Sequence, residues 1–232
     1  MIIDLIVLIP IIAALAIGLG AEGRKTALGA AGANLILGVI VIGELMRLGG
    51  EELIFETSTV ILENPKLTLG FAVDGMSGVL VLLTVIVTFC AVYISPEKAP
   101  DGRVKLYHIS PLLISAGALG AFCSTDLFFL FAFHELALIP TFLMIGIYGH
   151  GRERLAIAWK ITIYLGVGSL VLLGGLIALY SNLTSDGFAT FNIAELTVIA
   201  ETMQLDQEVQ KWIFLLHYCQ PGQGFYLWES AH

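Results

Sequence analysis

The stretch that decides the fold is Leu127 to Gly149, LFFLFAFHELALIPTFLMIGIYG. It is long enough to cross a membrane as one helix, because about 20 helical residues span about 30 Å of hydrocarbon. His134 and Glu135 lie side by side near its middle. A charged residue at the bilayer centre costs roughly 2.5 to 3.5 kcal/mol, so ionisable groups there usually face a protein interior or a wet cavity and mark an ion path. Glu135 is therefore a candidate functional residue.

The composition of the whole chain indicates an integral membrane protein. Of its 232 residues, 57% are hydrophobic and 13% are charged, and the mean hydropathy is +0.90, which is too apolar for a soluble domain of this length. The net charge is −8, but the acidic residues concentrate in two connecting stretches, Glu51 to Glu63 and Asp186 to Glu208. We interpret both as solvated loops rather than as a surface for a basic partner. We expect the lipid bilayer as a partner and no nucleic acid.

Six apolar runs have the length of a membrane span. They are Ile2 to Leu19, Ala27 to Met46, Met76 to Ile94, Tyr107 to Cys123, Leu127 to Tyr148 and Ala156 to Tyr180. Unpaired backbone groups cannot face lipid, so each run should be a helix. The predicted fold class is therefore all-α, a polytopic membrane helix bundle with about six complete transmembrane helices.

The distribution of Lys and Arg predicts the orientation of this bundle. The first, third and fifth connections hold seven of the basic residues, whereas the second and sixth hold three and the fourth holds none. Because cytoplasmic connections carry an excess of Lys and Arg, the odd connections should be cytoplasmic and the amino terminus outside. The seven are Arg24, Lys25, Lys98, Arg103, Lys105, Arg152 and Arg154.

Two further polar residues near the spans have two possible roles each. Lys160, one turn inside the sixth span, could extend its charge to the cytoplasmic interface or face Glu135. Asp74, just before the third span, could cap that helix or stand at a water entry, and capping is the favoured role.

No metal site or cluster is predicted. His134 and Glu135 open the string HELAL, but Leu138 stands where a zinc protease pattern needs its second histidine. The three cysteines, Cys90, Cys123 and Cys219, lack the paired spacing of zinc or iron–sulfur sites.

The stretch from Asp126 to Leu179, DLFFLFAFHELALIPTFLMIGIYGHGRERLAIAWKITIYLGVGSLVLLGGLIAL, resembles the antiporter-like chain M of the proton-pumping NADH–quinone oxidoreductase, respiratory complex I. The shared pattern is F-x-x-F-x-x-x-E-L-x-L-I-P, then a G-H-x-R loop, then A-x-x-K-x-x-x-Y and G-S. The resemblance covers Met1 to about Leu216, so residues 1–216 are expected to form the amino-terminal part of an antiporter-like domain that usually has fourteen helices. Residues 217–232, HYCQPGQGFYLWESAH, are expected to be a tail foreign to the family.

The resemblance implies a role for several residues. Glu135 aligns with a glutamate that belongs to a buried charged pair and takes part in proton translocation, usually with a lysine of the seventh span. We assign the proton path to Glu135 and Lys160, with His134 and Asp74 as possible further members. His134 departs from the family, where an aromatic residue is expected in many relatives.

The expected function is that of a proton-translocating membrane subunit of NADH–quinone oxidoreductase, in truncated form, with no cofactor in this chain. Its partners would be other membrane subunits of the respiratory complex, and its location the bacterial inner membrane. One alternative is a subunit of a sodium/proton antiporter complex or of a membrane-bound hydrogenase. Another is a non-functional fragment of a disrupted gene, because the tail from His217 onward cannot complete a span.

Overall fold

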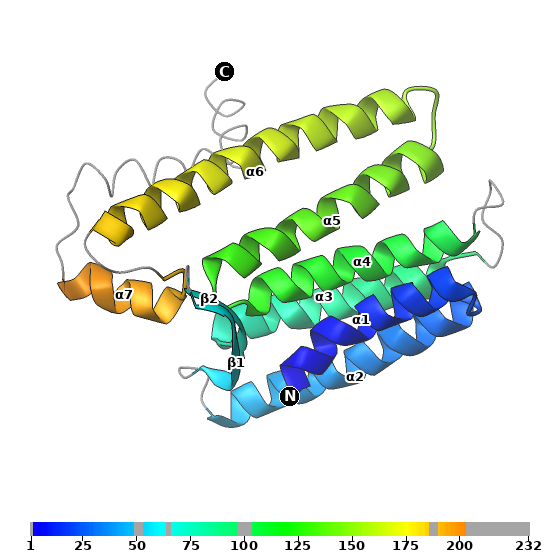
Figure 1. Ribbon diagram of the computed structural model, residues 1–232. Helices are drawn as coiled ribbons and strands as arrows, with labels where there is room; N and C mark the ends of the chain where they lie inside the picture. Colours follow the sequence, from blue (N-terminus) through cyan, green and yellow to red (C-terminus); the bar gives the residue numbers. More distant parts are fainter. Residues whose placement is uncertain (1, 49–52, 64–65, 97–103, 186–189, 203–232) are drawn as a thin grey trace, which may run out of the picture.

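The computed structural model describes residues 2–48, 53–63, 66–96, 104–185 and 190–202 (Figure 1). The expected tail, 217–232, and the apolar segment Lys211 to Leu216 lie outside the described residues.

The described residues include six helices that are long and apolar enough to cross a membrane, so the predicted membrane helix bundle is confirmed. A ten-residue helix, α7, and a two-stranded hairpin lie beyond the ends of the spans. The elements are α1 (Ile2–Leu19), α2 (Gly23–Leu48), β1 (Ile54–Glu63), β2 (Lys66–Val73), α3 (Gly75–Ile94), α4 (Val104–Cys123), α5 (Leu127–Tyr148), α6 (Arg154–Ser185) and α7 (Ile193–Thr202).

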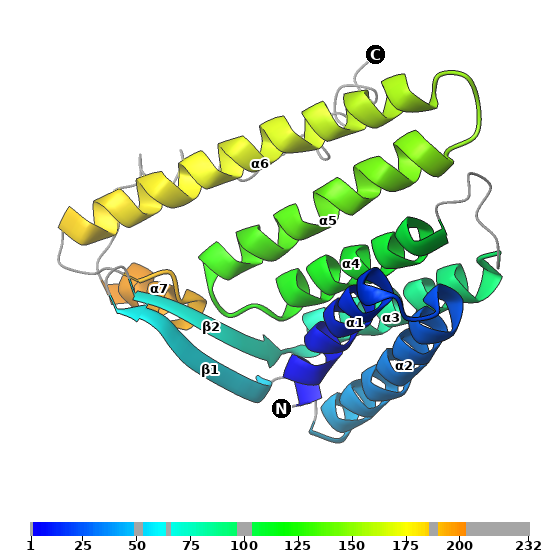
Figure 2. The ribbon, with the colours of Figure 1, turned by 45° about the vertical axis from the view of Figure 1, so that its right-hand side comes forward.

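The six long helices run up and down in turn (Figures 1 and 2). The connections α1–α2, α3–α4 and α5–α6 lie at one end of the bundle, which we call the basic end because it holds Arg24, Lys105 and Arg154. The β-hairpin, the α4–α5 connection and the start of α7 lie at the other end, which we call the hairpin end. This alternation is the one that the basic residues predicted. Which end faces the cytoplasm stays a prediction.

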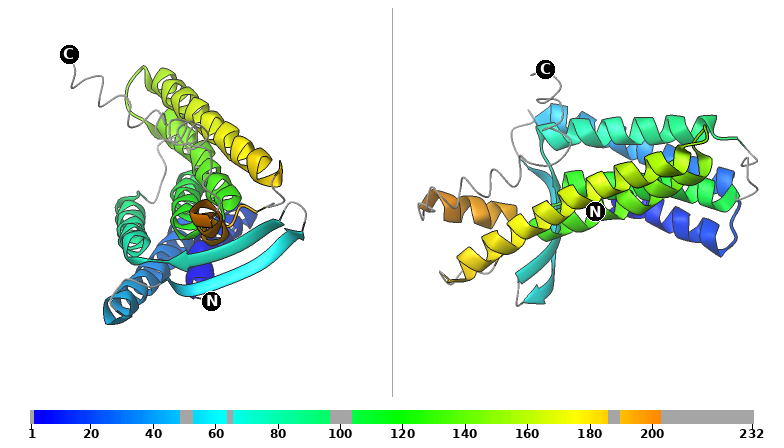
Figure 3. Two further views of the ribbon diagram at one scale, coloured as in Figure 1. Left: turned by 90° about the vertical axis from the view of Figure 1, so that its left-hand side faces the viewer. Right: turned by 90° about the horizontal axis from the view of Figure 1, so that it is seen from above.

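The core of the molecule lies among α1 to α4 (Figure 3). Helix α4 packs against α1, α2, α3 and α5, whereas α6 packs against α5 on the outer side of the bundle. Pro10 lies inside α1 and has no N–H for the carbonyl of Ile6, one turn earlier. The buried side chain of Asn34, on α2, donates to that carbonyl at 2.9 Å. The side-chain hydrogen bond from Asn34 thus replaces the missing backbone hydrogen bond of α1 inside the apolar core.

The stretch Glu51 to Glu63, which we expected to be a solvated loop, instead supplies strand β1 for its residues from Ile54 on. It pairs in antiparallel fashion with β2. The reason lies in its composition: IFETSTVIL is rich in β-branched residues, which fit a pleated strand. The interpretation of Asp186 to Glu208 as a loop also fails in part, because α7 forms within it. The Asn192 side chain caps α7 by accepting from the backbone of Ala194 and Glu195 at 3.0 and 3.2 Å.

Candidate functional site

Helix α5 carries the two ionisable residues of the candidate site, His134 and Glu135. The helix begins after Asp126, whose side chain accepts from the backbone N–H of Phe128 at 2.9 Å. At its other end, the N–H of Gly149 bonds to the carbonyl of Ile145 at 3.0 Å. Both ends of α5 are therefore defined, and Glu135 lies well inside the span between them.

His134 and Glu135 contact each other but remain incompletely satisfied. The His134 Nδ1 and Glu135 Oε1 atoms are 3.5 Å apart, and the two side chains are 42% and 32% exposed. Neither atom has a hydrogen-bond partner among the described residues, although each is itself covered. The separation is too long for a strong hydrogen bond, and an ion pair forms only when the imidazole is protonated. The contact between the two side chains is therefore loose.

Helix α4 approaches α5 closely at the depth of this pair. A Cβ atom on Gly117 would lie 2.7 Å from the carbonyl oxygen of Phe133 and 3.0 Å from the backbone nitrogen of Ala137. A Cβ on Gly120 would lie 2.3 Å from the Phe133 ring. Such small residues let two membrane helices approach backbone to backbone. Phe133 and Ala137 therefore anchor the α4-facing side of α5.

The register of α6 on α5 places Lys160 away from Glu135. Phe142 and Trp159 pack edge to face with ring centroids 5.0 Å apart, so Lys160 lies beside the turn of α5 that contains Phe142. Glu135 precedes Phe142 by seven residues, so it lies about 10 Å deeper along the bundle, at 1.5 Å per residue.

Lys160 itself is exposed, and the described part of the chain contains no ion pair between it and Glu135. The structure thus does not bring these two predicted residues together. The placement near the basic end fits the interfacial alternative for Lys160, and its role in a proton path stays a prediction.

Asp74 caps α3, as favoured by the sequence. Its side chain accepts from the backbone N–H of Ser77 at 2.7 Å, and the Ser77 hydroxyl accepts from the Asp74 N–H at 2.9 Å. These bonds from Ser77 lower the pKa of the Asp74 carboxyl, despite an opposing effect of burial. A further role of Asp74 in a proton path stays a prediction.

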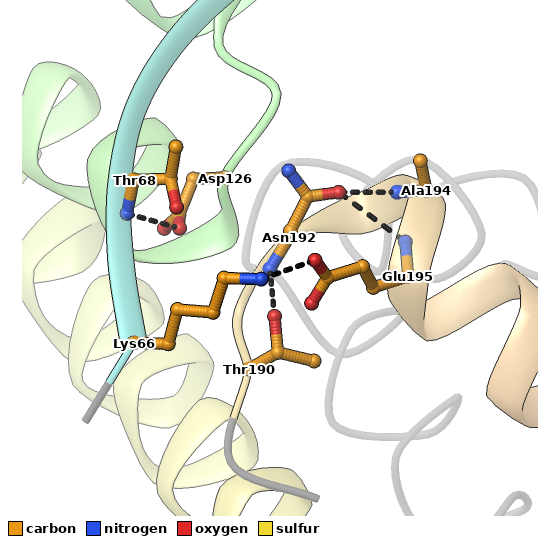
Figure 4. A network of polar contacts seen from close by, with 7 residues as sticks. All are labelled: Lys66, Thr68, Asp126, Thr190, Asn192, Ala194 and Glu195. Atoms are coloured by element: carbon orange, nitrogen blue, oxygen red, sulfur yellow. Dashed lines mark hydrogen bonds and ion pairs between the residues drawn. The ribbon is translucent and has the colours of Figure 1, made fainter. Parts of the chain in front are cut away.

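A polar network that the sequence analysis missed holds the start of α5 (Figure 4). Asp126 is fully buried, and its second carboxylate oxygen accepts from the backbone N–H of Thr68, on β2, at 3.2 Å. Burial raises the pKa of Asp126, and the hydrogen bonds from backbone N–H groups offset part of this rise. Nearby, Lys66 forms an ion pair with Glu195 on α7. The signal that could have found Asp126 is an aspartate directly before an apolar helical run, which is typical of an N-cap.

Comparison with known proteins places the site within a recognised segment. Residues 124–219 match the family described as NADH:quinone oxidoreductase/Mrp antiporter, TM. NADH-ubiquinone oxidoreductase chain 4 of Dictyostelium discoideum is 30% identical over 193 residues, which are 78% of this chain and 34% of that protein. NADH-quinone oxidoreductase subunit M of Escherichia coli is 32% identical over 135 residues, which are 56% of this chain and 26% of that protein.

Solved structures share the fold. A chain of respiratory complex I from Thermus thermophilus with bound NADH aligns with a TM-score of 0.76 at 24% identity, over 94% of this chain and 43% of that one. A chain of the archaeal membrane-bound sulfane sulfur reductase gives the same TM-score at 17% identity, over 93% of this chain and 43% of that one. The chain thus spans less than half the length of each of these four proteins. In sequence it resembles a segment of subunit M of NADH–quinone oxidoreductase, and in fold it resembles a segment of a chain of respiratory complex I.

Proposed function

We propose that this chain corresponds to part of a proton-translocating membrane subunit of an NADH–quinone oxidoreductase, in which Glu135 carries the proton. The observation behind the proposal is a carboxylate inside a membrane span, within the segment that matches the family. A carboxylate is costly there, and those that occur are usually paired or mark an ion path. Among the described residues, the polar contact of Glu135 is the loose one with His134, at 3.5 Å.

The two sides of α5 around Glu135 are packed differently. The α4-facing side of α5 is fixed by the close approach of Gly117 and Gly120. Glu135 precedes Phe142 by two helical turns, so it lies on the side of α5 that faces α6. At its depth, α6 supplies Gly166, where an added Cβ would meet nothing within 4 Å. A closely packed α4 side and a residue without a side chain on the α6 side would let the carboxylate change its protonation without repacking the core.

The remaining parts of the proposal concern the surroundings of the chain. We infer that other membrane subunits of a respiratory complex are its partners and that the bacterial inner membrane is its location. We infer further that the chain holds no redox cofactor, so that coupling to electron transfer arrives from partner subunits. Its place across the bilayer would put the basic end in the cytoplasm.

The test is the Glu135→Gln substitution in a complete complex that carries this α5. Glutamine keeps the shape and most of the hydrogen bonding of glutamate but cannot exchange a proton, so pumping into vesicles should be lost while assembly and insertion persist. Glu135→Asp, which keeps the carboxyl group, is the matched control and should retain part of the pumping. Unchanged pumping with glutamine would make Glu135 a packing residue, and lost assembly would make it structural.

A sodium/proton antiporter subunit is the second candidate, because the description of the matching family includes the Mrp antiporter. The same vesicles distinguish the two functions. Proton movement that persists without sodium and needs NADH and quinone supports the first function, whereas proton movement that requires a sodium gradient supports the second.

A further inference from the structure

Three segments that are distant in the sequence meet at the start of α5, and we call their meeting point the α5 clamp. It consists of Lys66 to Gly70 of β2, Thr125 and Asp126 of the α4–α5 connection, and residues 190–195 before and within α7. Figure 4 shows its polar side chains. On the β2 side, the N–H of Thr125 donates to the carbonyl of Gly70 at 3.0 Å, and the N–H of Thr68 donates to Asp126 at 3.2 Å.

The second side of the clamp is formed by the segment that leads into α7. The N–H of Leu127 donates to the carbonyl of Phe191 at 3.0 Å, and the N–H of Ile193 donates to the carbonyl of Thr125 at 2.9 Å. The Phe191 ring also stacks on Tyr180 of α6, with centroids 4.8 Å apart. A backbone bond thus joins the first residue of α5 to the segment before α7, and the ring stack joins that segment to α6.

The clamp adds to lateral packing that leaves most of α5 half-buried. Helix α5 packs along α4 and α6, and in its most apolar part 6% of the residues are buried, compared with 50% in α4. Besides the close contacts with α4, the hydrogen bonds of the clamp hold the start of α5.

We propose that Asp126 is a positioning residue that fixes the start of α5, and with it the depth of Glu135, by joining the helix to the hairpin. One carboxylate oxygen caps α5 through Phe128 and the other holds β2 through Thr68. No other side chain of the described network makes both contacts. Glu195 on α7 interacts electrostatically with Asp126, and Glu195 itself pairs with Lys66 of β2 across the clamp.

The first test measures hydrogen exchange on the whole chain in lipid nanodiscs. Asp126→Ala should speed exchange of the Thr68, Phe128 and Phe129 amides by about fivefold, because both the cap and the tie to β2 are lost. Asp126→Asn keeps one acceptor oxygen and replaces the other with an amide NH2, so it should restore exchange to within about twofold of the wild-type rate at the Phe128 or the Thr68 amide, but not at both. Thr197→Ala, on the exposed side of α7, is the control and should change none of these amides. Equal exchange in the alanine variant and the wild type would overturn the proposal.

The second test exchanges the charges of the Lys66–Glu195 pair. Lys66→Glu alone places two carboxylates together and should speed exchange across residues 191–195 by several fold, with a smaller effect at Phe128. Adding Glu195→Lys restores an opposite-charge pair and should return both regions toward the wild-type rate. A double variant that exchanges as fast as Lys66→Glu would show that the pair does not hold the clamp.

The inference rests on the proposed function only where it concerns Glu135, and the two can fail separately. Pumping in a complete complex should fall in Asp126→Ala and recover only in part in Asp126→Asn. If Glu135→Gln leaves pumping intact while the exchange results hold, the proposed function fails and the clamp stands. If Glu135→Gln abolishes pumping while Asp126→Ala changes neither exchange nor pumping, the positioning role of Asp126 fails and the proposed function stands.

Discussion

The region formed by α1 to α4 and the region formed by α5 and α6 differ in how the polar side chains near their spans are hydrogen-bonded. In the first region, Asn34 is bonded to a carbonyl of α1 and Asp74 forms a reciprocal cap with Ser77. In the second region, the polar contact of Glu135 among the described residues is the loose one with His134, and Lys160 is exposed. Asn34 and Asp74 therefore maintain the structure through their hydrogen bonds, whereas the side chains of the pair on α5 are held less firmly. Four substitutions test this division, from the largest expected effect to the smallest.

The largest effect should come from Gly117→Ala, at the boundary between the two regions. The added Cβ would lie 2.7 Å from the Phe133 carbonyl oxygen, so α4 and α5 must separate, at a cost of about 3 kcal/mol of unfolding free energy. Gly43→Ala is the matched control, because a Cβ at this exposed helical position meets nothing within 4 Å and should stabilise by about 0.5 kcal/mol. Unfolding in mixed micelles measures both. A cost below that of an ordinary surface change would show that α5 is not held closely by α4.

Asn34→Leu should destabilise α1 and α2 by about 2 kcal/mol, because the Ile6 carbonyl is then buried without a donor. Pro10→Ala supplies a backbone N–H to that carbonyl, so the same leucine substitution should cost much less in its presence. The double-mutant cycle therefore isolates the bond from general packing. Additive effects of the two substitutions would contradict the compensation.

Asp74→Ala should cost about 1 kcal/mol, the usual value of a helix cap, with no direct effect on proton transfer. Asp74→Asn retains the acceptor and should cost less. Thermal unfolding and pumping in a complete complex give the two readouts. A loss of pumping in the asparagine variant, with stability retained, would show that Asp74 takes part in proton transfer.

The smallest effect concerns pH and the Lys66–Glu195 pair. The hydrogen bond from Lys66 lowers the pKa of Glu195 below its usual value of 4.5. The pair therefore stabilises the fold fully above that value, and the contribution disappears as the pH falls through the lowered pKa of the folded state. Both side chains are more than 40% exposed, so Lys66→Met should cost only about 0.5 kcal/mol at neutral pH, and less in acid.

The contribution of Asp126 to the unfolding free energy should change with pH in the opposite direction. Burial raises its pKa, so its ionised form is disfavoured in the folded protein, and stability relative to Asp126→Asn should rise as the pH falls through the raised value. Unfolding free energies measured from neutral to acidic pH check both signs. Parallel curves for Lys66→Met and the wild type would show that the pair contributes nothing.

The sequence predicts the spans well and their connections poorly, and the reason is physical. A membrane span is decided by local hydrophobicity, so the fifth run, Leu127 to Tyr148, coincides with α5. The hairpin depends on pairing between β1 and β2 and on contacts with the distant α4–α5 connection, which no local pattern contains. For the same reason, the sequence could propose both Glu135 and Lys160 but not their separation, because that distance depends on the register of α6 on α5.

The bond between Asn34 and the Ile6 carbonyl also constrains how the protein is made. During synthesis α1 enters the membrane before α2, and on its own it would expose to lipid a carbonyl that Pro10 leaves without a partner. The two helices should therefore leave the translocation machinery as a pair rather than one at a time. Over evolutionary time, loss of the proline should relax selection on the asparagine, so that positions 10 and 34 vary together among related sequences.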